Sequence, residues 1–107
     1  MKKLALTIAN KNIAFKVFMP FVEDGAAFVP TEEVCGLGEA ITLTINMPEL
    51  QKEITCPGAV VWVSPAGAHT KQGVGVQFQG KEGDQMKQAL ETYIVGMKDE
   101  GKKTFTL

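Results

Sequence analysis

Few side chains in this sequence are placed for catalysis. His69 is the only histidine and lies in the loop Pro65–Gln72, where we expect it to be solvated. Cys35 and Cys56 stand apart from each other and from a histidine, so we expect two reduced thiols rather than a nucleophile or a metal site. No serine stands in a Gly-x-Ser-x-Gly turn, and no glycine-rich phosphate loop is complete. The sequence therefore predicts no enzyme, no cofactor, and no catalytic or metal-binding residues.

The chain contains no arginine among its 107 residues. A guanidinium offers a planar fork of donors that matches phosphates and guanine edges, whereas a lysine ammonium is a point charge. The 11 basic residues are all lysines, they are scattered, and the formal net charge is −1. This balance gives no electrostatic reason to bind nucleic acid or an anionic membrane.

Length and composition predict a single domain over residues 1–107. The apolar share of 45% and the charged share of 21% are those of an ordinary globular protein. The apolar run Leu4–Ala9 is shorter than the core of a secretory signal, and no run reaches the ~20 apolar residues of a membrane span. We therefore expect a cytoplasmic protein, and we take a monomer as its state.

Apolar periodicity predicts strands over most of the chain. Leu4–Ile8 and Ile13–Phe18 are separated by turn-forming residues, so we expect them to pair as a hairpin. A short strand is predicted over Ala26–Val29. Ile41–Met47 alternates strictly, with four apolar residues on one face, which is typical of a sheet with one solvated side.

In the second half of the chain the spacing of apolar residues changes from that of strands to that of a helix. Glu53–Ser64 is predicted as a longer strand with a bulge or bend at Pro57-Gly58, and Gly73–Gln79 as the last strand. A helix is predicted over about Glu82–Lys98, because an apolar stripe follows its spacing. The stripe consists of Met86, Leu90, Tyr93, Ile94 and Met97. This order predicts an all-β fold with a C-terminal helix, as either a six- or seven-stranded antiparallel β-barrel or a closed sandwich.

One apolar segment, Phe18–Val22, does not fit a regular central strand. Pro20 has no N–H to donate, so not every side chain of the segment can face inward while its backbone is paired. Trp62 faces outward if its neighbours Val61 and Val63 fill the core. The alternative, with Trp62 in the core and the two valines outside, stays open. Exposed aromatic and methionine side chains usually mark a protein-binding surface. We predict such a surface from Trp62 and part of this segment, with Phe18, Met19 and Phe21 as the candidate residues. The alternative is that the segment belongs to the core, as Phe18 or Val22 could.

Four blocks of the sequence, in order, resemble the PilZ domains that accompany type IV pilus machinery. They are MPFVEDGAAFVPT, which spans Met19–Thr31, then LGEAITLTINM, GAVVWVSP and GVGVQF. The resemblance implies a PilZ-like β-barrel, a fold best known for binding cyclic di-GMP. Receptors of the family carry R-x-x-x-R and (D/N)-x-S-x-x-G. Here the first motif has no arginine, and Phe21, Glu23 and Ala26 replace the specified residues of the second.

The resemblance therefore implies the branch of the family that lacks the cyclic di-GMP motifs and binds proteins. Its pilus-type members act as adaptors. The implied partners are the hexameric ATPase that drives pilus extension and a regulator with degenerate cyclic-nucleotide turnover domains. We expect a non-enzymatic adaptor of type IV pilus assembly and twitching motility. The alternative is a cyclic di-GMP receptor with a non-standard site.

Overall fold

The computed structural model describes residues 2–65, 67 and 72–106, with side chains described up to residue 95. The predicted position of His69 and the side chain of Met97 lie outside these residues. The elements are β1 (Lys2–Thr7), α1 (Lys11–Val17), β2 (Phe18–Met19), β3 (Ala26–Pro30), β4 (Ala40–Met47), the 3-10 turn η1 (Pro48–Leu50), β5 (Lys52–Ser64), β6 (Gly73–Phe78) and α2 (Gly80–Thr106).

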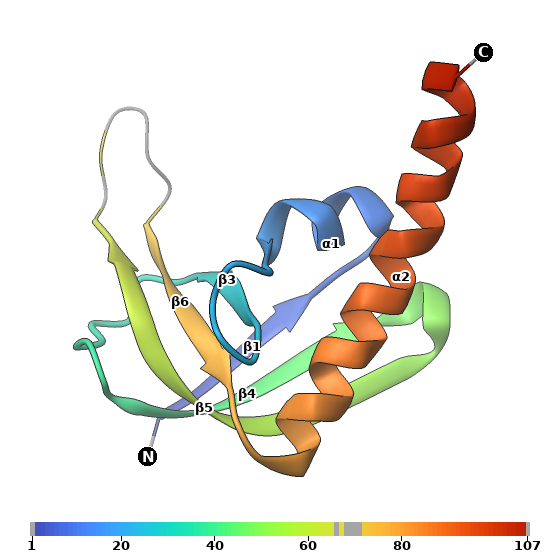
Figure 1. Cartoon of the computed structure of the whole chain (residues 1–107). Helices are drawn as coiled ribbons and strands as arrows, with labels where there is room; N and C mark the ends of the chain where they lie inside the picture. The colour runs from blue at the N-terminus through green and yellow to red at the C-terminus, as the bar shows by residue number, and fades with distance from the viewer. Residues whose placement is uncertain (1, 66, 68–71, 107) are drawn as a thin grey trace.

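The strands form one curved sheet in the order β1-β4-β5-β6-β3-β2. Both helices lie on its concave side, with α2 crossing β5 and β6 (Figure 1). The core lies between the sheet and the helices. Its largest fully buried side chains are Phe78, Ile8, Ile41, Leu43, Ile45, Met47, Met86, Leu90, Val29, Val60, Val74 and Val76.

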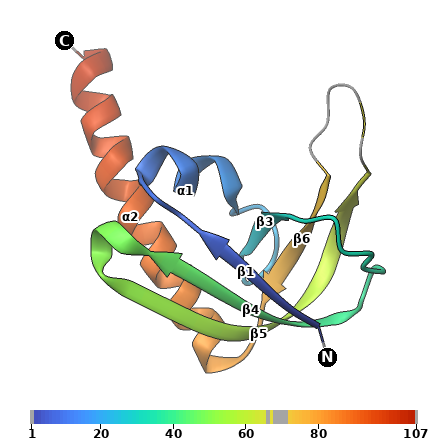
Figure 2. The ribbon, with the colours of Figure 1, turned by 180° about the vertical axis from the view of Figure 1, so that it is seen from behind.

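Six strands followed by a helix agree with the prediction, but the closed antiparallel barrel does not. In the described part of the chain the sheet is open, because its order ends at β1 on one side and at β2 on the other. The pairing of β1 with β4 is also parallel (Figure 2). The cause is α1, which follows β1 directly, so the next stretch of chain does not return as an antiparallel neighbour of β1.

The predicted strand Ile13–Phe18, and with it the N-terminal hairpin, is wrong. Residues Lys11–Val17 form α1, because the Asn10 side chain caps the helix by accepting a hydrogen bond from the Ile13 N–H at 3.0 Å. The buried residues of this helix are Ala14 and Val17, which are three positions apart. This helical spacing overrides the apolar alternation that favours a strand.

The predictions for the middle strands are confirmed. Strand β4 spans Ala40–Met47, and the four alternating apolar side chains predicted for it are all fully buried. Strand β3 has the expected position, and β6 ends one residue before its predicted end at Gln79. Alternation was informative for β4 because one face of this strand packs on the core while the other does not.

Strand β5 contains a bulge, but not at the predicted place. Pro57 and Gly58 keep an unbroken register with β4. Glycine is needed at position 58 because a Cβ there would lie 2.6 Å from the Gln77 carbonyl oxygen of β6. The register shift falls three residues later, between Val60 and Trp62.

The C-terminal helix packs through its predicted stripe. Met86, Leu90, Tyr93 and Ile94 are all buried in the hydrophobic core. The Tyr93 hydroxyl donates a hydrogen bond to the Glu49 carboxylate of η1, which ties the helix to the turn between β4 and β5. Burial, assisted by this carboxylate, raises the pKa of Tyr93 to about 12. Within the described residues, no helix has the length and apolar character needed to cross a membrane.

We predict that Leu90→Ala lowers the free energy of unfolding by about 2–5 kcal/mol, because the leucine is fully buried and its removal leaves a cavity. Val95→Ala is the matched control on the same helix. Val95 is exposed, so its truncation should change the free energy by no more than about 0.5 kcal/mol. Urea denaturation of both variants measures this, and equal midpoints would show that α2 is not packed through Leu90.

Candidate functional site

The bulge in β5 decides where the only tryptophan points. Val60 pairs with Val76 of β6, whereas Trp62 pairs with Gly75, the adjacent residue of the same strand. Val61 is therefore an extra residue on β5. Successive residues of a strand face opposite sides, so the buried Val76 marks the core face and Gly75 the outer face. Trp62 shares the outer face with Gly75 and is 55% exposed.

The outward orientation of Trp62 is thus confirmed, but the parity argument behind it is wrong. Val61 and Val63 do not fill the core, since their exposed fractions are 38% and 42%. Strict alternation would put Val60 and Trp62 on the same face. The bulge places Val60 on the core face and Trp62 on the outer face. Strict alternation of side chains along the strand cannot predict this arrangement.

The Trp62 side chain packs directly over Gly75, which has no side chain of its own. A Cβ added at position 75 would lie 2.9 Å from the Trp62 Cβ and 3.1 Å from the Met19 Sδ. Side chains from β5 and β2 therefore lie over the bare backbone of β6. This structure brings together two of the predicted partner-binding residues, Met19 and Trp62, although they are far apart in the sequence.

Phe28 is a third member of this surface that the sequence did not point to. It pairs with Gly75 from the other side, and its ring carbon Cζ lies 2.6 Å from where a Cβ of Gly73 would be. The two glycines thus leave room for larger neighbours. The GVGV pattern of β6 was the available clue, because its glycines alternate with buried valines and so mark the outer face. We call Met19, Phe28 and Trp62, with Gly73 and Gly75 beneath them, the outer-face patch.

The remaining two predicted residues lie differently. Phe21 is 80% exposed in the turn between β2 and β3, a turn closed by a hydrogen bond from the Val22 N–H to the Met19 carbonyl. Phe18 is buried and stacks on Phe78, with ring centroids 6.5 Å apart. Of the residues predicted for the partner surface, Phe18 therefore belongs to the core. Phe18 and Met19 are consecutive residues of β2 and face opposite sides of the sheet.

Acidic side chains border the exposed Phe21. Glu23 and Asp24 are both exposed in the same turn. The turn is attached to β6 because the Gln77 Nε2 donates to the Glu23 carbonyl oxygen at 2.9 Å. At the positions where receptors have their second motif, this chain therefore presents an exposed ring at Phe21, a carboxylate at Glu23 and a fully buried Ala26. None of these groups donates a hydrogen bond from its side chain to a phosphate.

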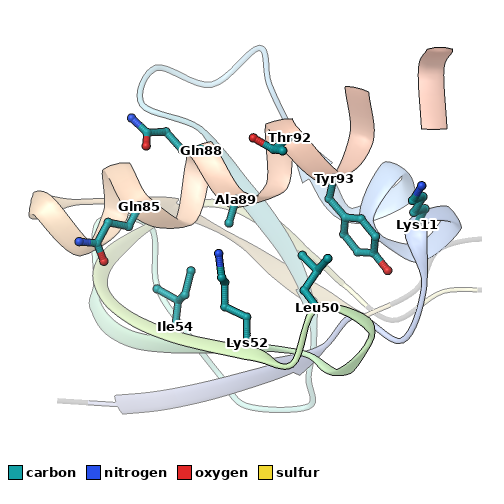
Figure 3. A pocket seen from close by; sticks show the side chains of 9 residues that line it. All are labelled: Lys11, Leu50, Lys52, Ile54, Gln85, Gln88, Ala89, Thr92 and Tyr93. Carbon is teal, nitrogen blue, oxygen red and sulfur yellow. The ribbon is translucent and has the colours of Figure 1, made fainter. Parts of the chain in front are cut away.

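A separate groove of about 730 Å³ lies between α2 and the start of β5 (Figure 3). Lys52 points from β5 toward α2, and Ile54 of β5 and Ala89 of α2 add apolar surface to the groove. The lining residues are Lys11, Leu50, Lys52, Ile54, Gln85, Gln88, Ala89, Thr92 and Tyr93. Its two ammonium groups could attract an anion as point charges, but they lack the paired donors that recognise a guanine edge.

We predict that Gly75→Ala destabilises the protein by about 1–3 kcal/mol, because the new methyl group meets the Cβ of Trp62, which is fixed to the backbone. Gly36→Ala is the control, since a Cβ there meets nothing within 4 Å and should change stability by no more than about 0.5 kcal/mol. The chain has one tryptophan, so its fluorescence emission reports Trp62 alone. An unchanged emission spectrum and midpoint for Gly75→Ala would contradict the contact.

Comparison with known proteins agrees with this architecture. No curated protein shows a significant match to the chain. The family model of the PilZ domain matches residues 2–96, which include all six strands and more than half of α2. PilZ domains are non-catalytic binding domains linked to cyclic di-GMP signalling and pilus regulation. The chain belongs to the PilZ domain family.

Proposed function

We propose that this PilZ domain is a cytoplasmic adaptor of type IV pilus assembly and twitching motility, which acts through protein contacts and does not bind cyclic di-GMP. The proposed partners are the pilus extension ATPase and a regulator with degenerate cyclic-nucleotide turnover domains. The whole chain is taken as one monomeric domain. The observation that carries the proposal is the outward Trp62 held beside Met19 on a glycine floor.

The outer-face patch has the physical properties of a protein-binding hot spot. Tryptophan is the side chain most enriched in such spots, and Trp62 is oriented by the bulge and by Gly75 before any partner arrives. Less side-chain entropy is then lost on binding. Met19 adds an adaptable apolar surface. The carboxylates of Glu23 and Asp24, in the turn that follows β2, supply polar groups for the border of such an interface.

Three features argue against a nucleotide receptor of the usual kind. The chain has no arginine to clamp a phosphodiester or a guanine. Glu23 would repel a phosphate from the turn between β2 and β3. Ala26 is fully buried and paired with Gln77, so it offers no open backbone to a ligand. These features support the branch of the family that lacks the cyclic di-GMP motifs.

One observation favours the alternative of a non-standard nucleotide site. The groove between α2 and β5 is large, and two lysines, Lys11 and Lys52, line it at separate places. An anionic ligand would be attracted there, at a place unrelated to the family's motif positions. The absence of a guanidinium makes this groove a poor match for guanine, so the adaptor function remains the proposal.

We predict that cyclic di-GMP does not bind measurably in isothermal titration calorimetry up to high-micromolar ligand. The physical reason is the missing arginines together with Phe21, Glu23 and Ala26 at the motif positions. Saturable heat with a stoichiometry of one or two ligands per chain would contradict the proposal. In that case Lys52→Ala would test the groove, since loss of the heat would locate the nucleotide there.

We predict that Trp62→Ala weakens binding to at least one purified partner, the extension ATPase or the regulator, by about tenfold or more. The melting temperature should stay close to that of the wild type, because alanine keeps the Cβ that contacts Gly75 and the ring is half exposed. Val34→Ala is the matched control, as Val34 is 84% exposed on a loop outside the patch. A large fall in melting temperature, or wild-type affinity for both partners, would count against the proposal.

A further inference from the structure

A second apolar hollow lies between helices α1 and α2, on the side of β2 opposite to Met19. Its volume is about 340 Å³. Phe15 of α1 and Val95 of α2 stand on its walls and are 53% and 52% exposed, whereas Phe18 and Ile94 are buried. We call it the helix groove, and its lining residues are Phe15, Phe18, Pro20, Glu91, Ile94 and Val95.

The shape of the helix groove suits an added helix. The residues that α2 contributes, Glu91, Ile94 and Val95, have the spacing i, i+3 and i+4 and so form one ridge of that helix. The opposite wall is α1, which presents Phe15. A groove bounded by two helices accepts a third through apolar side chains at the same spacing, the helix-in-groove mode of recognition.

The charge of the helix groove indicates which charged residue the partner helix carries. Among the described side chains that line it, Glu91 alone carries a formal charge. It is exposed, so its carboxylate can meet a cation at the border of an interface rather than in its buried centre. A complementary segment carries a lysine or arginine next to its apolar stripe.

We infer that the helix groove is a second protein-docking site, which takes an amphipathic helix with a basic residue beside Glu91. The inference rests on the proposed function, because an adaptor that holds two proteins together needs two separate surfaces. One short segment, residues 18–20, contributes side chains to both surfaces. Met19 belongs to the outer-face patch, while its neighbours Phe18 and Pro20 line the helix groove.

The test compares binding of purified extension ATPase and purified regulator to variants of the two surfaces by isothermal titration calorimetry. Phe15→Ser should weaken one of these proteins by about tenfold or more and leave the other unchanged, whereas Trp62→Ala should weaken the other. Glu91→Lys should weaken the same protein as Phe15→Ser, and more strongly at low salt. Val34→Ser is the control for removing an exposed aliphatic side chain.

The outcomes separate this inference from the proposed function. If the wild type binds neither protein, the adaptor function and the second site both fail. If the wild type binds, but Phe15→Ser keeps full affinity for both proteins or loses the same one as Trp62→Ala, only the second site is overturned. A wild-type dimer that Phe15→Ser converts to a monomer in light scattering would assign the groove to a second copy and also overturn it. Val95→Ser replaces Phe15→Ser if circular dichroism shows that the latter is unfolded.

Discussion

Side chains on a strand alternate between two faces, so one inserted residue moves everything after it to the opposite face. Val61 is such an insertion in β5. Without it, Trp62 would continue the core face of Val60. With it, the ring lies on the outer face over Gly75, and the glycines of β6 make room for Met19 and Phe28 as well. The place of Trp62 in the outer-face patch therefore depends on a single extra backbone residue.

The N-terminal helix has a comparable effect on the other face of the molecule. Asn10 caps α1, and the C-cap residue Phe18 donates its N–H to the Ala14 carbonyl, so the chain leaves the helix directly into β2. This exit sends Phe18 inward to stack on Phe78 and leaves Met19 outside. It also places Phe15 opposite Glu91, Ile94 and Val95 of α2. The inward position of Phe18, which lines the helix groove, and the outward position of Met19 are thus consequences of the same change of direction.

The thiol and the loop carboxyl group with shifted pKa values have structural surroundings. Burial of the Cys56 thiol raises its pKa to about 11 and keeps it protonated and unreactive near neutral pH. At the exposed loop before β4, by contrast, the Gly36 N–H and the Lys2 ammonium lower the pKa of Glu39 and favour its ionised form. That ion pair holds the loop near β1. Neither arrangement provides a group poised for proton transfer on a substrate.

The sequence by itself determined the elements in which one face is buried and the other is not. Ile41–Met47 and the helix stripe of Leu90 could both be predicted, since their apolar periods are long enough to be unambiguous. The strand Glu53–Ser64 could be predicted in its extent, but not in the face on which Trp62 lies. The absence of arginine and the changed motif positions also needed no structure. The tertiary structure alone decided whether Ile13–Phe18 is a helix or a strand, because a seven-residue helix is too short to form without its cap and its packing partners. It alone decided that β1 pairs with β4 in parallel and that Val61 is the extra residue, because strand partners and bulges are set by contacts between segments distant in the chain.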